Sequence, residues 1–178
     1  EEAEEKGEEC DYQEITPIVD SEFNYCQDHQ NKNQKDNGYQ VLLYAKNRKG
    51  FFNLSKLSSI SHVDGFYYIP RIDKDLIVKY KSDLVALTGG MYGFLASMIL
   101  NEGLEKAEKE LLWWKEHFGE DLYIEIGRHG LEEEQVLNEE LVKLSNKHQI
   151  KLINELSNSF SEFSERVQVG SIRQGSCL

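Results

Sequence analysis

Short apolar runs alternate along this chain with longer segments in which apolar residues recur every three or four positions. The clearest run, Gln40 to Ala45, reads QVLLYA, and similar runs cover residues 15–23, 83–87, 122–126 and 150–153. Nearly continuous apolar runs of this length are typical of strands that are buried on both faces. The pattern therefore predicts five strands.

Amphipathic segments separate most of these runs. Phe51, Leu54 and Leu57 fall on one helical face, and Asp64-Gly65 closes that helix. The same spacing predicts helices at residues 73–80, 92–100, 104–118 and 132–148. Leu104 and Val136 are expected on the buried stripes of the last two, and Asp73 can cap the helix at 73–80. Strands that alternate with helices predict an α/β fold, with a parallel sheet or barrel of βα units.

Length and composition narrow the class of protein. The chain has 178 residues, of which 39% are hydrophobic and 29% charged, which fits one soluble domain or a large piece of one. Its formal net charge of -12 argues against direct, non-specific binding to nucleic acid, because phosphate neutralisation requires clustered Lys and Arg. No apolar run reaches the roughly 18 residues of a membrane span.

The ends and the cysteines add less. Residues 1–9 contain six Glu and one Lys, so we expect a solvated acidic tail over residues 1–14. Cys10, Cys26 and Cys177 are odd in number and widely spaced, so they indicate neither a disulfide framework nor a zinc-binding pair. A reducing cytoplasm is the expected location.

Candidate functional residues follow from the position of the strand ends, where chemistry gathers in α/β folds. Glu22 is expected to end a buried strand, and a buried carboxylate must be paired, hydrogen-bonded or metal-bound, so a metal ligand and a structural salt bridge both stay open. Thr88-Gly89-Gly90 is better explained as a tight turn than as an anion cradle. His129, beside Arg128, is a metal ligand, a phosphate contact or a turn residue. The residues alone predict no complete catalytic constellation.

Several blocks of the sequence resemble the PHP domain of bacterial DNA polymerase III alpha subunits, over about residues 15–153. The most specific block is GFYYIPRID at residues 65–73. The others are GYQVLLYAKN at 38–47, NLSKLSS at 53–59, LWWKEHFG at 112–119 and LYIEIGRHG at 122–130. The resemblance implies a partial PHP-type distorted (β/α)7 barrel with parallel strands and flanking helices.

The resemblance also implies a site. The family binds up to three metal ions through His, Asp, Glu and Cys at strand ends, and in some members this site is a proofreading 3′–5′ exonuclease. Glu22 matches one metal-ligand Glu, whereas Gln40 stands where active members have His and Gly90 where they have Cys. Neither replacement supplies an imidazole or a thiolate. The implied site is degenerate and holds no cofactor, with Arg128, His129 and Asn154 at its rim.

The family pattern sets the expected boundaries. It opens with HxH and DH strands that should precede residue 15, and it continues after Asn154 with an Asp and a His that are not found here. We therefore expect a partial PHP domain at residues 15–155 and a divergent Ser-rich segment at 156–178, as in a truncated, frameshifted or partial gene product. The polymerase palm lies beyond this segment in the family, so no nucleotidyl transfer is expected.

The function implied by the resemblance is a scaffold and interaction module in DNA replication. Its expected partners are the remainder of the polymerase III alpha chain and the proofreading exonuclease subunit, with DNA contacted only indirectly and no membrane. The alternative is a metal-dependent phosphoesterase or 3′–5′ exonuclease that uses Glu22, His129 and either Asp121 or Glu125. Only this alternative requires a divalent metal ion, namely Zn, Mn or Mg.

Overall fold

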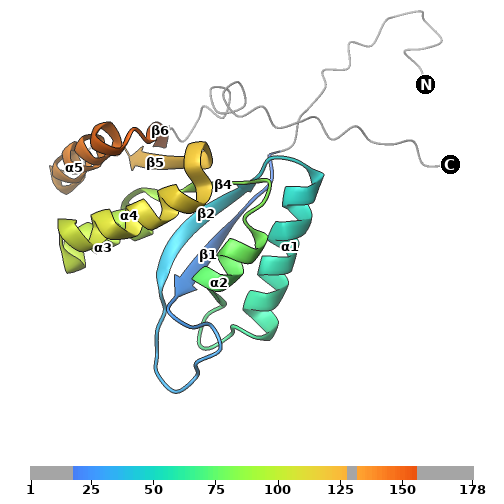
Figure 1. Cartoon of the computed structure of the whole chain (residues 1–178). Helices are drawn as coiled ribbons and strands as arrows, with labels where there is room; N and C mark the ends of the chain where they lie inside the picture. The colour runs from blue at the N-terminus through green and yellow to red at the C-terminus, as the bar shows by residue number, and fades with distance from the viewer. Residues whose placement is uncertain (1–17, 128–131, 156–178) are drawn as a thin grey trace, which may run out of the picture.

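The computed structural model describes residues 18–127 and 132–155, which form one sheet with helices packed against it (Figure 1). Six strands pair in the order β3-β1-β2-β4-β5-β6. Their bounds are β1 (Asp20–Cys26), β2 (Tyr39–Ala45), β3 (Arg71–Asp73), β4 (Leu84–Leu87), β5 (Leu122–Gly127) and β6 (Lys151–Glu155). Across the described ranges, β3 and β6 are the edge strands and the sheet does not close.

The helices follow the predicted periodicity closely. Their bounds are α1 (Arg48–Val63), α2 (Lys74–Tyr80), α3 (Phe94–Glu102), α4 (Leu104–Phe118) and α5 (Glu132–His148), with the 3-10 turns η2 (Gly90–Tyr92) and η3 (Gly119–Asp121) before α3 and β5. Asn47 caps α1 by accepting hydrogen bonds from the backbone N–H groups of Lys49 and Gly50. Among the helices that the structure describes, none combines the length and apolar content that crossing a bilayer requires.

The sheet is mostly parallel, as predicted, with β2 as the exception. β2 runs antiparallel to both of its neighbours, β1 and β4, whereas the other neighbouring pairs are parallel. The reason is the connection before β2, because loop 27–38 contains no helix, whereas parallel neighbours are usually joined by a helix that crosses over the sheet.

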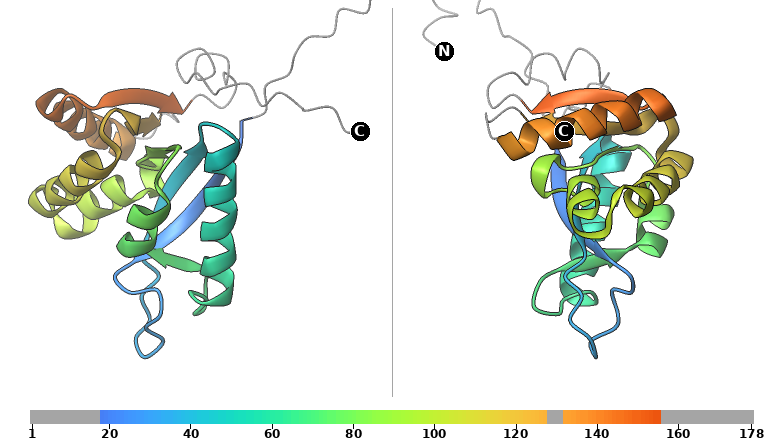
Figure 2. Two further views of the ribbon diagram at one scale, coloured as in Figure 1. Left: turned by 45° about the vertical axis from the view of Figure 1, so that its right-hand side comes forward. Right: turned by 90° about the vertical axis from the view of Figure 1, so that its left-hand side faces the viewer.

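Alternation along the strands gives the sheet two different faces. One face packs against all five described helices in a single core, to which Phe23, Val41, Ala86 and Ile124 contribute. Figure 2 shows these helices beside the sheet from two further directions. The opposite face, here called the open face, carries a smaller apolar cluster. Its members are Tyr44, Val85 and Leu87 with Ile18, Leu42, Tyr123 and Ile153, and within the described residues no helix contributes to it.

Three local predictions were wrong. Ile18 and Val19 precede the first strand instead of belonging to it, and β1 continues to Cys26, so Glu22 lies inside the strand rather than at its end. The predicted residues 15–17 lie outside the described residues. Leu104 is 41% exposed and Val136 is 68% exposed, so neither lies on a buried stripe. The short strand β3 was not predicted, because three residues are too few to show a period.

Arg71 is the buried cation that fastens loop 27–38 to the domain. Its side chain is fully buried, and its guanidinium donates hydrogen bonds to the backbone carbonyls of Gly65, Asp36, His29 and Asn31 at 3.0–3.2 Å. Three of these carbonyls belong to the loop. The planar guanidinium suits this arrangement because it presents five N–H donors in a fixed geometry.

We expect Arg71→Met to destabilise the fold by about 3 kcal/mol or more, because two buried and two partly buried carbonyls would lose their donor, at about 1–3 kcal/mol for each buried one. Urea unfolding at neutral pH measures the change. Arg48→Met is the matched control, since Arg48 is exposed and its replacement should change stability by less than about 0.5 kcal/mol. Equal effects of the two substitutions would contradict this account of the loop.

Candidate functional site

The carboxyl ends of β1, β3, β4, β5 and β6 lie along the same border of the sheet. We call this border, at the strand ends, the carboxyl edge, and the antiparallel β2 begins there. Gln40 is the second residue of β2, and Gly90 follows the end of β4, so both substituted ligand positions belong to this edge. A parallel bridge between Gln40 and Gly93 holds the two segments together. The edge is therefore where the resemblance placed the site.

The segment after β4 is the tight turn that the sequence predicted. Gly89 and Gly90 have φ values of 82° and 48°, in the left-handed region that favours glycine. A Cβ on Gly93 would lie 1.8 Å from the carbonyl oxygen of Thr88, so only glycine fits there. The Thr88 hydroxyl accepts a hydrogen bond from the backbone N–H of Glu125 at 3.1 Å, which ties the turn to β5.

Glu22 lies on the open face near Gln40. In the β1–β2 pairing Glu22 is opposite Leu42, and Gln40 is two residues before Leu42 in β2, a diagonal neighbour of Glu22 at roughly 7–8 Å. Glu22 is exposed rather than buried as predicted, so its carboxylate needs no partner to offset desolvation. Its assignment as a metal ligand stays a prediction that depends on the resemblance.

The two other carboxylates of the alternative hypothesis lie apart from Glu22. Asp121 precedes β5, at the opposite edge of the sheet, where it accepts from the Lys46 ammonium at 2.7 and 2.8 Å. Glu125 pairs in register with Ile153, whose side chain belongs to the open-face cluster, so Glu125 lies on the open face. Three strand spacings, about 14 Å, separate the backbones of Glu22 and Glu125. One ion cannot bind both carboxylates across that spacing, because each ligand oxygen must lie within about 2.6 Å of the ion.

Of the three residues predicted at the rim of the site, the structure describes only one. Arg128 and His129 lie outside the described residues. Asn154 is in β6, paired with Ile126 of β5, and its backbone therefore reaches the same edge of the sheet as Gln40.

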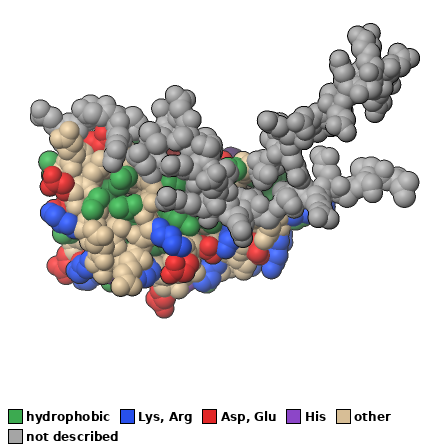
Figure 3. Space-filling model, turned by 90° about the horizontal axis from the view of Figure 1, so that it is seen from above, with side chains coloured by type: hydrophobic (Ala, Val, Ile, Leu, Met, Phe, Trp, Pro, Cys, Tyr) green, Lys and Arg blue, Asp and Glu red, His purple; other side chains and the backbone are tan. Residues whose placement is uncertain are grey.

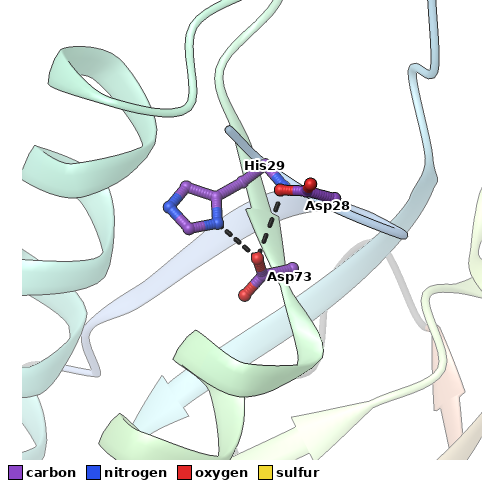
Figure 4. Close-up of side chains that lie close together, drawn as sticks. All are labelled: Asp28, His29 and Asp73. Carbon is purple, nitrogen blue, oxygen red and sulfur yellow. Dashed lines mark hydrogen bonds and ion pairs between the residues drawn. The ribbon is translucent and has the colours of Figure 1, made fainter. Parts of the chain in front are cut away.

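The structure also brings together three residues that the sequence did not connect. Asp28, His29 and Asp73 place one ligand atom each within 4.8 Å of one another (Figure 4). The His29 imidazole Nδ1 contacts Asp73 Oδ2, and the backbone N–H of His29 donates to the same oxygen at 3.3 Å. Since 44 residues separate His29 from Asp73, no local pattern could reveal the pair.

This cluster is built as a structural lock. Asp73 Oδ1 caps α2 by accepting from the backbone N–H of Leu76 at 3.0 Å, and Asp28 Oδ1 accepts from the backbone N–H of Gln30 at 2.9 Å. Each of these carboxylates already serves the backbone, and the imidazole serves Asp73. The cluster therefore joins loop 27–38 to α2 and needs no metal ion to do so.

Cys26 ends β1 at the same edge but is a poor ligand. Burial raises the pKa of its thiol to about 11, and its Sγ donates to the carbonyl of Ile72 at 3.4 Å. The thiolate is the form that binds metals and attacks substrates. At neutral pH the thiol stays protonated and acts as a core residue.

Comparison with known proteins agrees with this architecture. The PHP domain family matches residues 1–129. The chain is 45% identical over 117 residues to the DNA polymerase III subunit alpha of Borreliella burgdorferi, covering 64% of this chain and 10% of that protein. It is 35% identical over 148 residues to that of Aquifex aeolicus, covering 78% of this chain and 13% of that protein. The Campylobacter jejuni subunit is 33% identical over 163 residues, with 83% and 13% covered.

The chain therefore belongs to the PHP domain family. Within that family it is similar to the DNA polymerase III alpha subunits, as the blocks around GFYYIPRID predicted. It spans 10–13% of the length of these three relatives. The acidic run at residues 1–9, whose composition predicted a tail, lies inside the matched region.

The His29–Asp73 contact predicts a pH-dependent contribution to stability. Burial raises the pKa of Asp73, but the hydrogen bonds from His29 and from the backbone of Leu76 lower it by more, so the net pKa lies below its usual range. A lowered carboxyl pKa stabilises the fold above the unfolded pKa of about 3.9, and the contribution is lost as pH falls through the folded value.

We expect Asp73→Asn to destabilise the fold by about 2 kcal/mol at pH 7, because the amide keeps the cap but loses the charged hydrogen bond to His29. The difference from the native chain should shrink as pH falls below about 4. Asp75→Asn removes an equal charge from an exposed position in the same helical turn and serves as the control. Urea unfolding across this pH range measures both, and a pH-independent Asp73→Asn effect would rule out the charge as its cause.

Proposed function

We propose that this chain is the PHP-domain segment of a bacterial replicative DNA polymerase III alpha subunit, and that it acts as a scaffold and interaction module with a degenerate metal site. The relatives supply the polymerase assignment, since those quoted above are named DNA polymerase III subunit alpha. The role in DNA replication rests on that likeness.

The observation that carries the degenerate site is the chemistry of the sheet edge. Gln40 offers a neutral amide, Gly90 has no side chain, and Leu42 and Leu87 fill neighbouring positions on the open face. A site that binds two or three ions needs several imidazole, carboxylate or thiolate ligands that converge. Glu22 alone does not meet that need, and Asp121 is engaged by Lys46 at the other edge.

We expect the purified chain to bind Zn, Mn or Mg well below one ion per molecule, and to release no nucleotides from DNA 3′ ends. Elemental analysis and an assay with 3′-labelled single-stranded DNA measure the two properties. Glu22→Gln should change neither. Stoichiometric metal together with hydrolysis that Glu22→Gln abolishes would instead establish the metal-dependent phosphoesterase or exonuclease.

The substituted position can also be tested by gain of function. Gln40→His places an imidazole diagonally across from Glu22, so we expect a measurable rise in Zn affinity over the native chain. Gln40→His combined with Glu22→Gln is the control and should lose that rise. If Gln40→His binds no more Zn than the native chain, these two positions do not lie within reach of one ion.

The interaction role predicts binding to other replicase parts. The chain should co-elute in size-exclusion chromatography with the remainder of the polymerase III alpha chain, or with the proofreading exonuclease subunit, when each is supplied as a purified partner. Lys143→Ala, a variant at an exposed position, is the control for non-specific binding to surface charge. Co-elution with neither partner would contradict the proposed role.

A further inference from the structure

Charge is distributed very unevenly along this acidic chain. Residues 46–82, which contain α1 and α2, carry eight Lys or Arg against three Asp and no Glu, a formal charge of +5 in a chain of net charge -12. Helix α1 itself contains Arg48, Lys49 and Lys56 and no acidic residue. In the view from above, basic side chains show on both sides of the described part, among acidic ones, and those on the right lie on the side where Figure 1 draws α1 (Figure 3).

Three of these cations lie over aromatic rings on the outer surface of α1 and α2. Arg48 lies 5.7 Å from the ring centre of Phe52, and the ammonium groups of Lys56 and Lys79 lie 5.8 and 5.3 Å from that of Tyr80. Phe52 is half exposed. We call these five residues the α1–α2 basic surface.

The cations of this surface lack the carboxylate partners that nearby lysines have among the described residues. Lys46, Lys49 and Lys74 are each paired with a carboxylate, those of Asp121, Asp83 and Glu110 respectively. Among the residues that the structure describes, no carboxylate pairs with Arg48, Lys56 or Lys79. The positive charge of the surface is therefore engaged in no ion pair with a described side chain.

The amino end of α1 adds to this positive character. Helix dipoles favour acidic side chains in the first turn, yet the first turn of α1 contains Arg48 and Lys49 and no acidic residue. Asn47 supplies the cap without supplying charge. A carboxylate from elsewhere would be favoured both by the dipole and by these two side chains.

The described part of the chain nearest in sequence to the acidic run lies beside this end of the helix. Val19 accepts a hydrogen bond from the backbone N–H of Ala45 at 2.9 Å, and α1 begins three residues later, at Arg48. The eight residues between the run and residue 18 can span up to about 28 Å when extended, and a 16-residue helix such as α1 is about 24 Å long. The run can therefore reach the whole basic surface.

We propose that the acidic run, residues 1–9, docks on the α1–α2 basic surface of its own chain. Six Glu against one Lys complement the cations that have no described carboxylate partner. A carboxylate-rich segment is favoured over single-stranded nucleic acid, because the rings of Phe52 and Tyr80 already face cations and bases would need those faces for stacking. This inference is independent of the polymerase assignment.

A nitroxide spin label on Cys10 tests the docking in the full chain. Cys177→Ser removes the other terminal thiol, and Cys26 is buried. At low salt, about 10 mM, we expect the label to broaden the amide resonances of α1 near Arg48 to Lys56 and of α2 near Lys79. At about 1 M salt, where the screening length falls to about 3 Å, the broadening should disappear.

A charge-matched pair of variants separates the surface from net charge. Lys56→Ala with Lys79→Ala should remove most of the broadening. Lys106→Ala with Lys109→Ala removes two positive charges from exposed positions of α4 and should leave it unchanged. An equal loss in both double variants would overturn the proposal, as would broadening that is absent from α1 or is equally strong on α4 and α5.

Two further controls identify the occupant. Broadening in a mixture of spin-labelled chains and separate isotope-labelled chains would assign the surface to a second copy and overturn docking within one chain. Added oligothymidylate that shifts the α1 resonances and ends the broadening would assign the surface to nucleic acid and also overturn the proposal.

Discussion

The alternation of side chains on the two faces of one open sheet is the constraint on which the rest of this structure depends. Every second strand residue packs against the helices, and the residues between them face the other way. In β1, Phe23 points into the core, and its neighbours Glu22 and Asn24 point to the opposite face. In β2, Val41 points into the core, and Gln40 and Leu42 point to the opposite face. A one-residue shift of either strand would bury the polar residues and expose the apolar ones. The core thus fixes which side chains any site on the open face can use.

A second constraint holds the sheet edge in place. Loop 27–38 lacks regular structure, and its backbone carbonyls are satisfied by the buried guanidinium of Arg71, while His29 is held by Asp73. Both anchoring residues, Arg71 and Asp73, lie in β3, an edge strand of three residues. This short strand belongs to the GFYYIPRID block, so the segment that resembles the family most specifically is also the one that carries the structural lock. In this protein Arg71 and Asp73 are buried and bonded to defined partners, so they stabilise the fold.

The chemistry of the open face and the charge of the helix side point to different tasks. On the open face, Gln40 and Leu87 lie near Glu22, and among the described residues they bring no imidazole, carboxylate or thiolate toward it. On the helix side, α1 and α2 concentrate positive charge within an acidic protein, and three cations that pair with no described carboxylate lie over aromatic rings. Such a surface suits an anionic partner whose attraction is sensitive to salt. The two faces are thus chemically independent parts of one domain.

Local sequence determined the helices and most strands of this protein. The bounds of α4 and α5 agree with the apolar spacing, and Asn47 and Asp73 cap α1 and α2 with side chains close in sequence to the N–H groups they bind. Periodicity and capping act over three to four residues, so a single stretch of sequence contains them. The family likeness was equally legible, because it resides in contiguous blocks such as GFYYIPRID.

Only the tertiary structure decided the direction of β2, the exposure of Glu22 and the contact between His29 and Asp73. Each depends on which distant segments lie side by side, and pairing across 44 residues leaves no mark on local spacing. The same holds for the separation of Glu22, inside β1, from Asp121, just before β5, which follows from the order and direction of the strands and not from composition. Residue types revealed which chemistry was available to this chain. The packing of its strands decided which of those groups can meet.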